Sequence, residues 1–283
     1  MIKNLLILAF ISLGLFATAQ TNLTIEWADI PAGTFTMGSP KSEAGRSDEE
    51  TQHQVTLSTF KMSKYEITVG QYKAFVDATG YVTNADEGTG FKGSAILIGR
   101  RVKLKKGSNW KCDMKGNLRP ETEYNHPVIH VSWYDAKAFA EWMGCRLPTE
   151  AEWEYACRAG TTTPFNTGTN LTTSQANYNG NYPYNENAKG EYREKTLPVG
   201  SFSPNAWGLY DMHGNVWEWC SDYYADYSAE AQTNPKGPSL QPGRLIRGAG
   251  WSGSAQFCRS AHRLAFDPIQ RCSWLGFRIV SPE

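Results

Sequence analysis

The chain has no net charge, because its 28 Lys and Arg residues balance 28 Asp and Glu residues. It therefore lacks the basic field that attracts nucleic acid or anionic membranes, and we expect neither as a partner. It also lacks a Pro/Ser-rich linker or a compositional break that would separate two domains. These absences favour a single domain, which we predict over residues 25–281.

Long apolar runs are also scarce, and the most prominent one stands at the N-terminus, "MIKNLLILAFISLGLFATAQ". It is shorter than the roughly 20 apolar residues that a membrane-spanning helix needs. Lys3 precedes the run, and Ala17 and Ala19 supply small residues at a cleavage site. Residues 1–19 are thus predicted to be a signal peptide, with the mature protein exported to a periplasmic or extracellular space and not stably inserted in a membrane.

Cysteine and histidine are few, with six cysteines and five histidines in 283 residues. An exported protein can form disulfides, but six cysteines allow 15 connectivities, so spacing leaves the pairing open. His126 and His130 stand four apart in "HPVIHVSW", where a β-branched run predicts a strand or turn. No carboxylate accompanies them, so we interpret both as packing residues rather than metal ligands.

Local patterns predict most of the elements. Residues 25–39 alternate apolar and polar side chains around Pro-Ala-Gly and indicate a hairpin, and two strands are expected within residues 53–68. Thr68 is a candidate N-cap for a helix that ends at Gly80. Residues 81–125 are expected to be irregular, with the basic stretch at 100–117 as a solvated surface insertion.

Two more helices are predicted further along the chain. Ser132 caps the first, over residues 132–144, and Thr149 with Glu152 forms a capping box for the second, over 147–160. Residues 161–205 show little periodicity. Short strand-like pieces follow at 215–224, 243–251 and 275–280.

The longest informative segments occur in a fixed order: "PAGTFTMGS", "HPVIHVSWYDAKAFAEWMGCRLPTEAEWEYACRAGT", "PVGSFSPNAWGLYDMHGNVWEWCSDYY", "RLIRGAGW" and "LGFRIV". Together they resemble the formylglycine-generating enzyme family, also called the sulfatase-modifying factor family. The resemblance implies an α+β fold, the family's variant of the C-type lectin fold. It has a small antiparallel sheet, two main helices and much irregular structure.

Formylglycine-generating enzymes oxidise a cysteine of a substrate protein with O2 and a copper ion held by two thiolates. The family's cysteine pair follows a Gly-Gly-Ser-aromatic turn, which here reads "GAGW" at 248–251 and is followed by a single cysteine, Cys258. Cys258 and Cys272 are the remaining weak catalytic candidates. Because export favours a disulfide, copper is the less favoured cofactor.

Calcium is the metal that the resemblance favours, in a structural role. The family's calcium loop corresponds to "HGNVWEWCSD", in which Asn215, Val216 and Glu218 would supply oxygen ligands. A second site would use Asn177 and the carbonyl of Tyr178.

The resemblance also implies a disulfide and a binding surface. The family pairs the cysteine of "YACR" with one in the C-terminal segment, which points to a Cys157–Cys258 bridge. Trp251, Phe257 and His262 would then line a surface for a protein, peptide or glycan ligand, and a sulfatase is a further candidate partner. The favoured function is an exported binding or accessory protein; the alternative is an oxidase that converts a target cysteine to formylglycine.

Overall fold

A bent antiparallel ribbon forms the N-terminal part of the structure, a computed structural model that describes residues 23–281; the predicted signal peptide lies outside this range. Strands β1 (Trp27–Ile30) and β2 (Gly33–Met37) do not pair with each other. Instead β1 pairs with β4 (Phe60–Ser63) and β2 with β3 (His53–Leu57). The predicted hairpin within residues 25–39 is therefore wrong. Pro31, which lacks a backbone N–H, marks the bend between two strands that join different sheets.

The three predicted helices are confirmed, and their N-termini lie where the capping residues predicted them. Helices α1 (Val69–Thr79), α3 (Trp133–Trp142) and α4 (Glu150–Arg158) each begin after a complete capping box, with Thr68, Ser132 and Thr149 as N-caps. Gly80 ends α1 in the left-handed conformation with φ of 68°. These boundaries depend on contacts within one turn, which is why local sequence located them.

The central sheet has the strand order β10–β9–β7–β11. Its strands are β7 (Trp217–Tyr223), β9 (Arg244–Arg247), β10 (Leu264–Phe266) and β11 (Leu275–Gly276). Strand β11 runs parallel to β7, and the short β8 (Gln232–Thr233) runs parallel to β3. The sheets are thus small, as predicted, but not wholly antiparallel.

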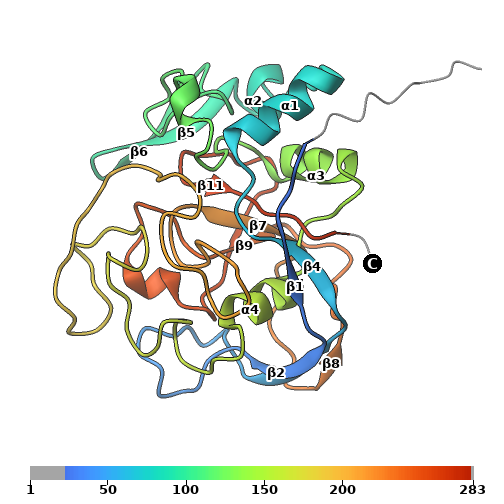
Figure 1. Ribbon diagram of the computed structural model, residues 1–283, viewed down its shortest axis with the longest axis vertical. Coiled ribbons are helices and arrows are strands. Elements are labelled where there is room, and N and C mark those ends of the chain that lie inside the picture. The colour runs from blue at the N-terminus through green and yellow to red at the C-terminus, as the bar shows by residue number, and fades with distance from the viewer. Residues whose placement is uncertain (1–22, 282–283) are drawn as a thin grey trace, which may run out of the picture.

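Residues 81–125 contain regular structure that the sequence analysis missed. They form the short helix α2 (Asn84–Glu87), a hairpin of β5 (Gly93–Ile98) and β6 (Arg101–Lys106), and the 3₁₀ helix η1 (Glu121–Glu123). The hairpin projects beside α1 and α2, at the opposite end of the molecule from β2 and β8 (Figure 1). A two-residue turn at Gly99 and Arg100 joins its strands, and this turn between the apolar run of β5 and the alternating run of β6 was the available sequence signal.

Helix α4 lies inside the molecule. It contacts β2, β7 and β9, and all nine of its residues are buried, charged ones included. Large apolar side chains such as Trp153 of α4, Trp219 of β7 and Phe277 are buried in the core. No helix within residues 23–281 combines the length and apolar character needed to cross a bilayer. The buried charges of α4 pair with arginines of residues 247–263, the segment that contains Trp251, Cys258 and His262.

Candidate functional site

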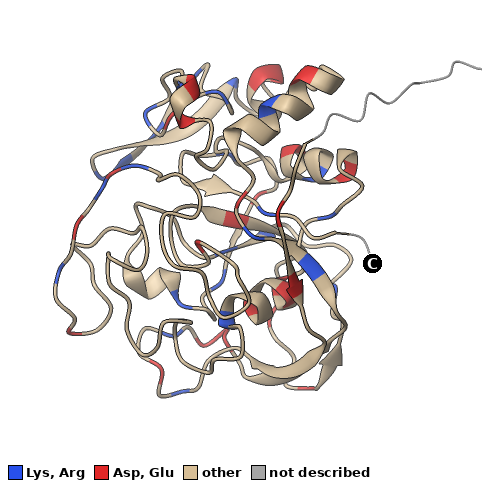
Figure 2. Ribbon diagram, viewed as in Figure 1, with Lys and Arg blue, Asp and Glu red and all other residues tan. Residues whose placement is uncertain are grey.

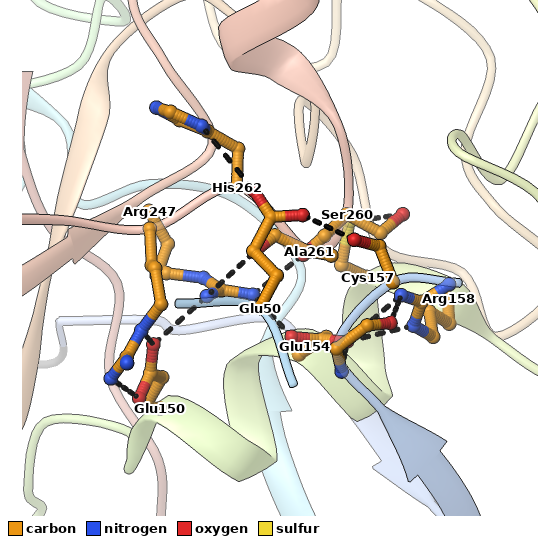
Figure 3. A network of polar contacts seen from close by, with 12 residues as sticks. Glu50, Glu150, Glu154, Cys157, Arg158, Arg247, Ser260, Ala261 and His262 are labelled. Atoms are coloured by element: carbon orange, nitrogen blue, oxygen red, sulfur yellow. Dashed lines mark hydrogen bonds and ion pairs between the residues drawn. The ribbon is translucent and has the colours of Figure 1, made fainter. Parts of the chain in front are cut away.

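Buried ion pairs join helix α4 to the segment 247–263 (Figure 3). Arg247 donates to Glu150 Oε1 at 2.9 Å and to Glu154 Oε2 at 2.6 Å, and Arg263 binds both oxygens of Glu150. Arg158 occupies the other oxygen of Glu154 at 2.9 Å. Burial alone would raise the pKa of Glu150, but the charges of Arg263 and Arg247 outweigh it and lower that pKa. Glu150 is therefore a structural anion, and Glu154 is held between two arginines.

A second cluster attaches the same segment to the loop between β2 and β3. Arg259 donates to Glu43 at 2.7 Å and to both oxygens of Glu50 at 2.7 and 2.8 Å. The guanidinium of Arg259 and the carboxylate of Glu50 are both fully buried. The segment is consequently held from two sides, which gives the residues around it a fixed frame.

The two cysteines predicted as weak catalytic candidates do not suit copper. Cys258, at the end of the 3₁₀ helix η2 (Ala255–Cys258), is fully buried, and its thiol lies 3.7 Å from the carbonyl of Ser254. Cys272 is 3 % exposed beside β5. Burial raises the pKa of both thiols far above the ordinary value. A copper site needs accessible thiolates, so these residues do not fit that ion.

The six cysteines are all free thiols in this structure, so the predicted Cys157–Cys258 bridge is not formed. The sulfur of Cys157 lies 3.6 Å from the hydroxyl of Ser260 and 3.9 Å from both ring nitrogens of His213. Cys258 stands two residues before Ser260, where η2 directs its thiol toward Ser254. Its pairing under oxidising conditions stays a prediction.

The predicted calcium ligands lie together, but two of them already have partners. Glu218 accepts two hydrogen bonds from Arg278, at 2.6 and 2.8 Å, and one from the indole of Trp153 at 2.7 Å. Asn215 Oδ1 accepts from the side chain of Asn177 at 3.1 Å and from the amide of Leu197 at 2.9 Å. Val216 and Tyr178, which directly follow Asn215 and Asn177 in the sequence, are buried. Glu218 therefore serves as the counter-ion of Arg278.

Two carboxylates beside this loop were missed by the sequence analysis. Glu66, 1 % exposed, accepts a hydrogen bond from Asn215 Nδ2 through Oε1. Its Oε2 meets no amide or hydroxyl donor among the described residues, and its carboxyl interacts with that of Asp211. Burial and the charge of Asp211 raise the pKa of Glu66 well above the ordinary value, and burial raises that of Asp211 to about 6. The only signal was that Glu66 stands as a lone acid within a strand-like run.

Within the described residues, unpartnered oxygens are found both on Glu66 and on Asn177, one of the predicted calcium ligands. Asn177 Oδ1 is also buried without a hydrogen bond among residues 23–281. Glu66, Asp211 and Asn177 would hold the ion, which prefers such hard oxygens and would neutralise the carboxylates. Over the same residues, no group of three or more His, Cys, Asp and Glu side chains has the arrangement of a metal site. Calcium therefore stays a prediction.

The histidine pair behaves as the packing interpretation expects. His126 Nδ1 bonds the hydroxyl of Thr196 at 2.9 Å. His130 bonds the hydroxyl of Ser94 through Nδ1 and the carbonyl of Asp113 through Nε2, each at 2.8 Å. Burial lowers the pKa of both imidazoles to about 4, so both are neutral at pH 7.

Trp251, one of the predicted binding residues, lines a cleft of about 260 Å³. Its ring is stacked with that of Tyr192, with 6.3 Å between centroids, and its indole N–H is held by the carbonyl of Ser273 at 2.9 Å. The charged side chains of Lys115 and Glu194 also line the cleft. Apolar residues of β5 and the following loops complete the wall: Ile96, Leu97, Ile98 and Met114.

Phe257 and His262 do not line this cleft. They stack on each other, with 4.9 Å between ring centroids and 29° between planes. Phe257 is 41 % exposed, whereas His262 is largely covered and lies 3.9 Å from Glu50. The structure thus separates the predicted surface into two places. The Trp251 cleft is the concave one.

Known proteins that are similar in sequence identify the family of this chain. The sequence profile of the FGE-sulfatase family, described as the sulfatase-modifying factor enzyme 1-like domain, matches residues 13–282. The chain is 36% identical to the formylglycine-generating enzyme of Mus musculus, over 89% of this chain and 74% of that protein. It is 37% identical to the formylglycine-generating enzyme of Streptomyces coelicolor, over 89% and 88%.

Solved structures show the same fold. PvdO from Pseudomonas aeruginosa superposes with a TM-score of 0.72 at 29% identity, over 92% of this chain and 95% of that one. The Treponema denticola variable protein 1 superposes with a TM-score of 0.65 at 24% identity, over 91% and 95%. The predicted fold class, an α+β variant of the C-type lectin fold, is thereby confirmed, and the chain belongs to the formylglycine-generating enzyme (sulfatase-modifying factor) family.

Proposed function

We propose that this protein is an exported family member that binds a peptide ligand in the Trp251 cleft and does not oxidise cysteine by a two-thiolate copper route. The observation that carries the proposal is that the protein has an open apolar cleft, whereas its two candidate catalytic cysteines are buried. Trp251 is the last residue of the glycine turn after which family members carry their two cysteines, whereas Cys258 and Cys272 are buried neutral thiols.

The size and lining of the cleft favour an apolar side chain as the occupant. About 260 Å³ lies below the usual range of sites for whole small molecules, roughly 300–1,000 Å³. Tyr192 and Trp251 supply aromatic surface, and Lys115 with Glu194 offers one charge of each sign. A large apolar residue within a peptide would bury its side chain there, with the flanking chain beside the two charges.

The test uses N-acetyl-tryptophanamide and N-acetyl-leucinamide as probes, followed by two-dimensional NMR of the isotope-labelled protein. We expect saturable shifts that include the indole N–H of Trp251 and are abolished in Trp251→Ala. Because Trp251 is nearly buried, Tyr192→Ala serves as the milder second variant, and Trp207→Ala, in another aromatic cluster, is the matched control. Shifts that persist in both cleft variants would refute the binding site.

The second candidate is the oxidase itself, which the identity of 36–37% to formylglycine-generating enzymes favours. Purified protein would be incubated with Cu(I), O2 and a peptide containing Cys-x-Pro-x-Arg, and the products read by mass spectrometry. We expect no formylglycine. Conversion that is lost in Cys258→Ser or Cys272→Ser would establish the oxidase and overturn the proposal.

A further inference from the structure

Strand β6 is an open sheet edge. The other strand of the hairpin, β5, is hydrogen-bonded to the body of the protein along the edge that faces away from β6. The amide of Ala95 donates to the carbonyl of Arg271 at 3.1 Å, and the carbonyl of Ala95 accepts from the amide of Ser273 at 2.9 Å. Within residues 23–281 the hairpin stays two-stranded, and the main chain of Arg101–Leu104 makes no hydrogen bond beyond those to β5. One row of backbone donors and acceptors is consequently unpaired.

The two faces of this strand differ in chemistry. Val102 and Leu104, on one face, are 61% and 64% exposed, and they stand opposite Leu97 and Ala95 of β5. Arg101, Lys103 and Lys105 occupy the other face, so Lys and Arg follow the hairpin (Figure 2). Lysine alone is a common protection of an edge, but two large aliphatic side chains left in water are not.

Charge decides between the candidate occupants of this edge. A second copy pairing antiparallel through β6 would place Arg101, Lys103 and Lys105 against the same basic residues, and like charges across a strand pair are destabilising. A strand that carries carboxylates on that face would instead gain ion pairs. On the other face it would cover Val102 and Leu104 with apolar side chains.

We propose that β6 binds an extended acidic peptide of another protein by strand addition. The recognised segment alternates an apolar residue with Glu or Asp, because successive side chains of an added strand point to opposite faces. Main-chain hydrogen bonds along Arg101–Leu104 supply affinity, and the alternation supplies specificity.

The first experiment measures binding by fluorescence anisotropy with a labelled peptide that alternates Glu with Val. We expect saturable binding that weakens as NaCl is raised, and at least tenfold weaker binding by the double variant Arg101→Glu/Lys103→Glu. Lys41→Glu, an exposed lysine in the loop between β2 and β3, is the matched control and should bind as the wild type does. Equal affinity for a peptide of the same composition with its Glu residues clustered would overturn the proposal.

The second experiment tests strand pairing apart from charge. Two versions of the peptide carry N-methyl groups on alternate amides, in opposite registers. Only the version whose methylated amides face away from β6 should keep its affinity, because the other loses its donors to the edge. Equal binding of both versions would refute strand addition, and dimerisation of the free protein that the peptide does not reverse would assign the edge to a second copy.

Discussion

The segment 247–263 and the β5–β6 hairpin both carry basic side chains. Those of the segment are buried and ion-paired, whereas those of the hairpin are largely exposed. Arg247, Arg259 and Arg263 are almost wholly buried, and each is matched by carboxylates within 2.9 Å. Arg101 and Lys103 are exposed and form no ion pair with a described carboxylate. The first set fixes the shape of the protein, because a buried charge without its partner is costly. The second set leaves charge available to a partner.

The largest effect expected from this contrast is on stability. Arg247→Met would leave Glu150 and Glu154 each short of a partner in the interior, and we expect the free energy of unfolding to fall by about 3–5 kcal/mol. Arg101→Met, the matched change on the hairpin, should alter it by less than about 0.5 kcal/mol. Urea denaturation of both variants provides the measurement, and similar losses would show that the two regions do not differ as described.

The pH dependence of stability tests the buried carboxyl group of Asp222. Burial and the negative charge of Glu150 raise the pKa of Asp222 to about 7, although its carboxylate accepts the amide of Glu150 at 2.9 Å. The folded state then holds a proton that the unfolded chain releases near pH 4. The contribution of Asp222 is therefore greatest below pH 4 and is lost as pH rises to 7, by at most about 4 kcal/mol.

Asp222→Asn removes this titration while it keeps an acceptor for the amide of Glu150. We expect the variant to gain stability relative to wild type between pH 4 and 8, as followed by thermal denaturation across that range. Parallel profiles for the two proteins would contradict the prediction.

A smaller and conditional effect is expected from calcium. An ion held by Glu66, Asp211 and Asn177 would stabilise the folded state by about 2.7 kcal/mol at a hundredfold excess over its Kd. The melting temperature should rise on addition of CaCl₂ and return with EGTA, and Glu66→Gln should remove most of the rise. An equal rise in wild type and Glu66→Gln would place the ion elsewhere.

What the sequence predicted depended on how far apart the interacting residues stand. The N-caps Thr68, Ser132 and Thr149 bond groups within three residues and were located correctly. The Arg259–Glu43 pair joins residues 216 positions apart, and no local pattern indicates it. Alternation located β1 and β2 but could not name their partners, because a strand's pattern shows which face is buried and not which strand lies beside it.

The residues of the candidate site were likewise predicted where a local motif marks them and missed where distant contacts make the site. The family turn at 248–251 located Trp251, but the cleft exists only because Tyr192 and the β5 hairpin close over it. Glu66 became a site residue through Asp211, 145 positions later, which the sequence did not connect with it. The basic stretch at 100–117 was interpreted as a solvated insertion because its charges conceal the alternation of β6.

Ser260 lies in the ion-paired segment 247–263, at a position where a reversible cross-link could be introduced. Its hydroxyl lies 3.6 Å from the sulfur of Cys157, between the end of helix α4 and the segment that follows Arg259. Ser260→Cys would place a second sulfur there and create a covalent latch that oxidant closes and reductant opens. The helix and the C-terminal segment could then be cross-linked by an oxidant and released by a reductant, so that the stiffness of this part of the fold could be controlled experimentally.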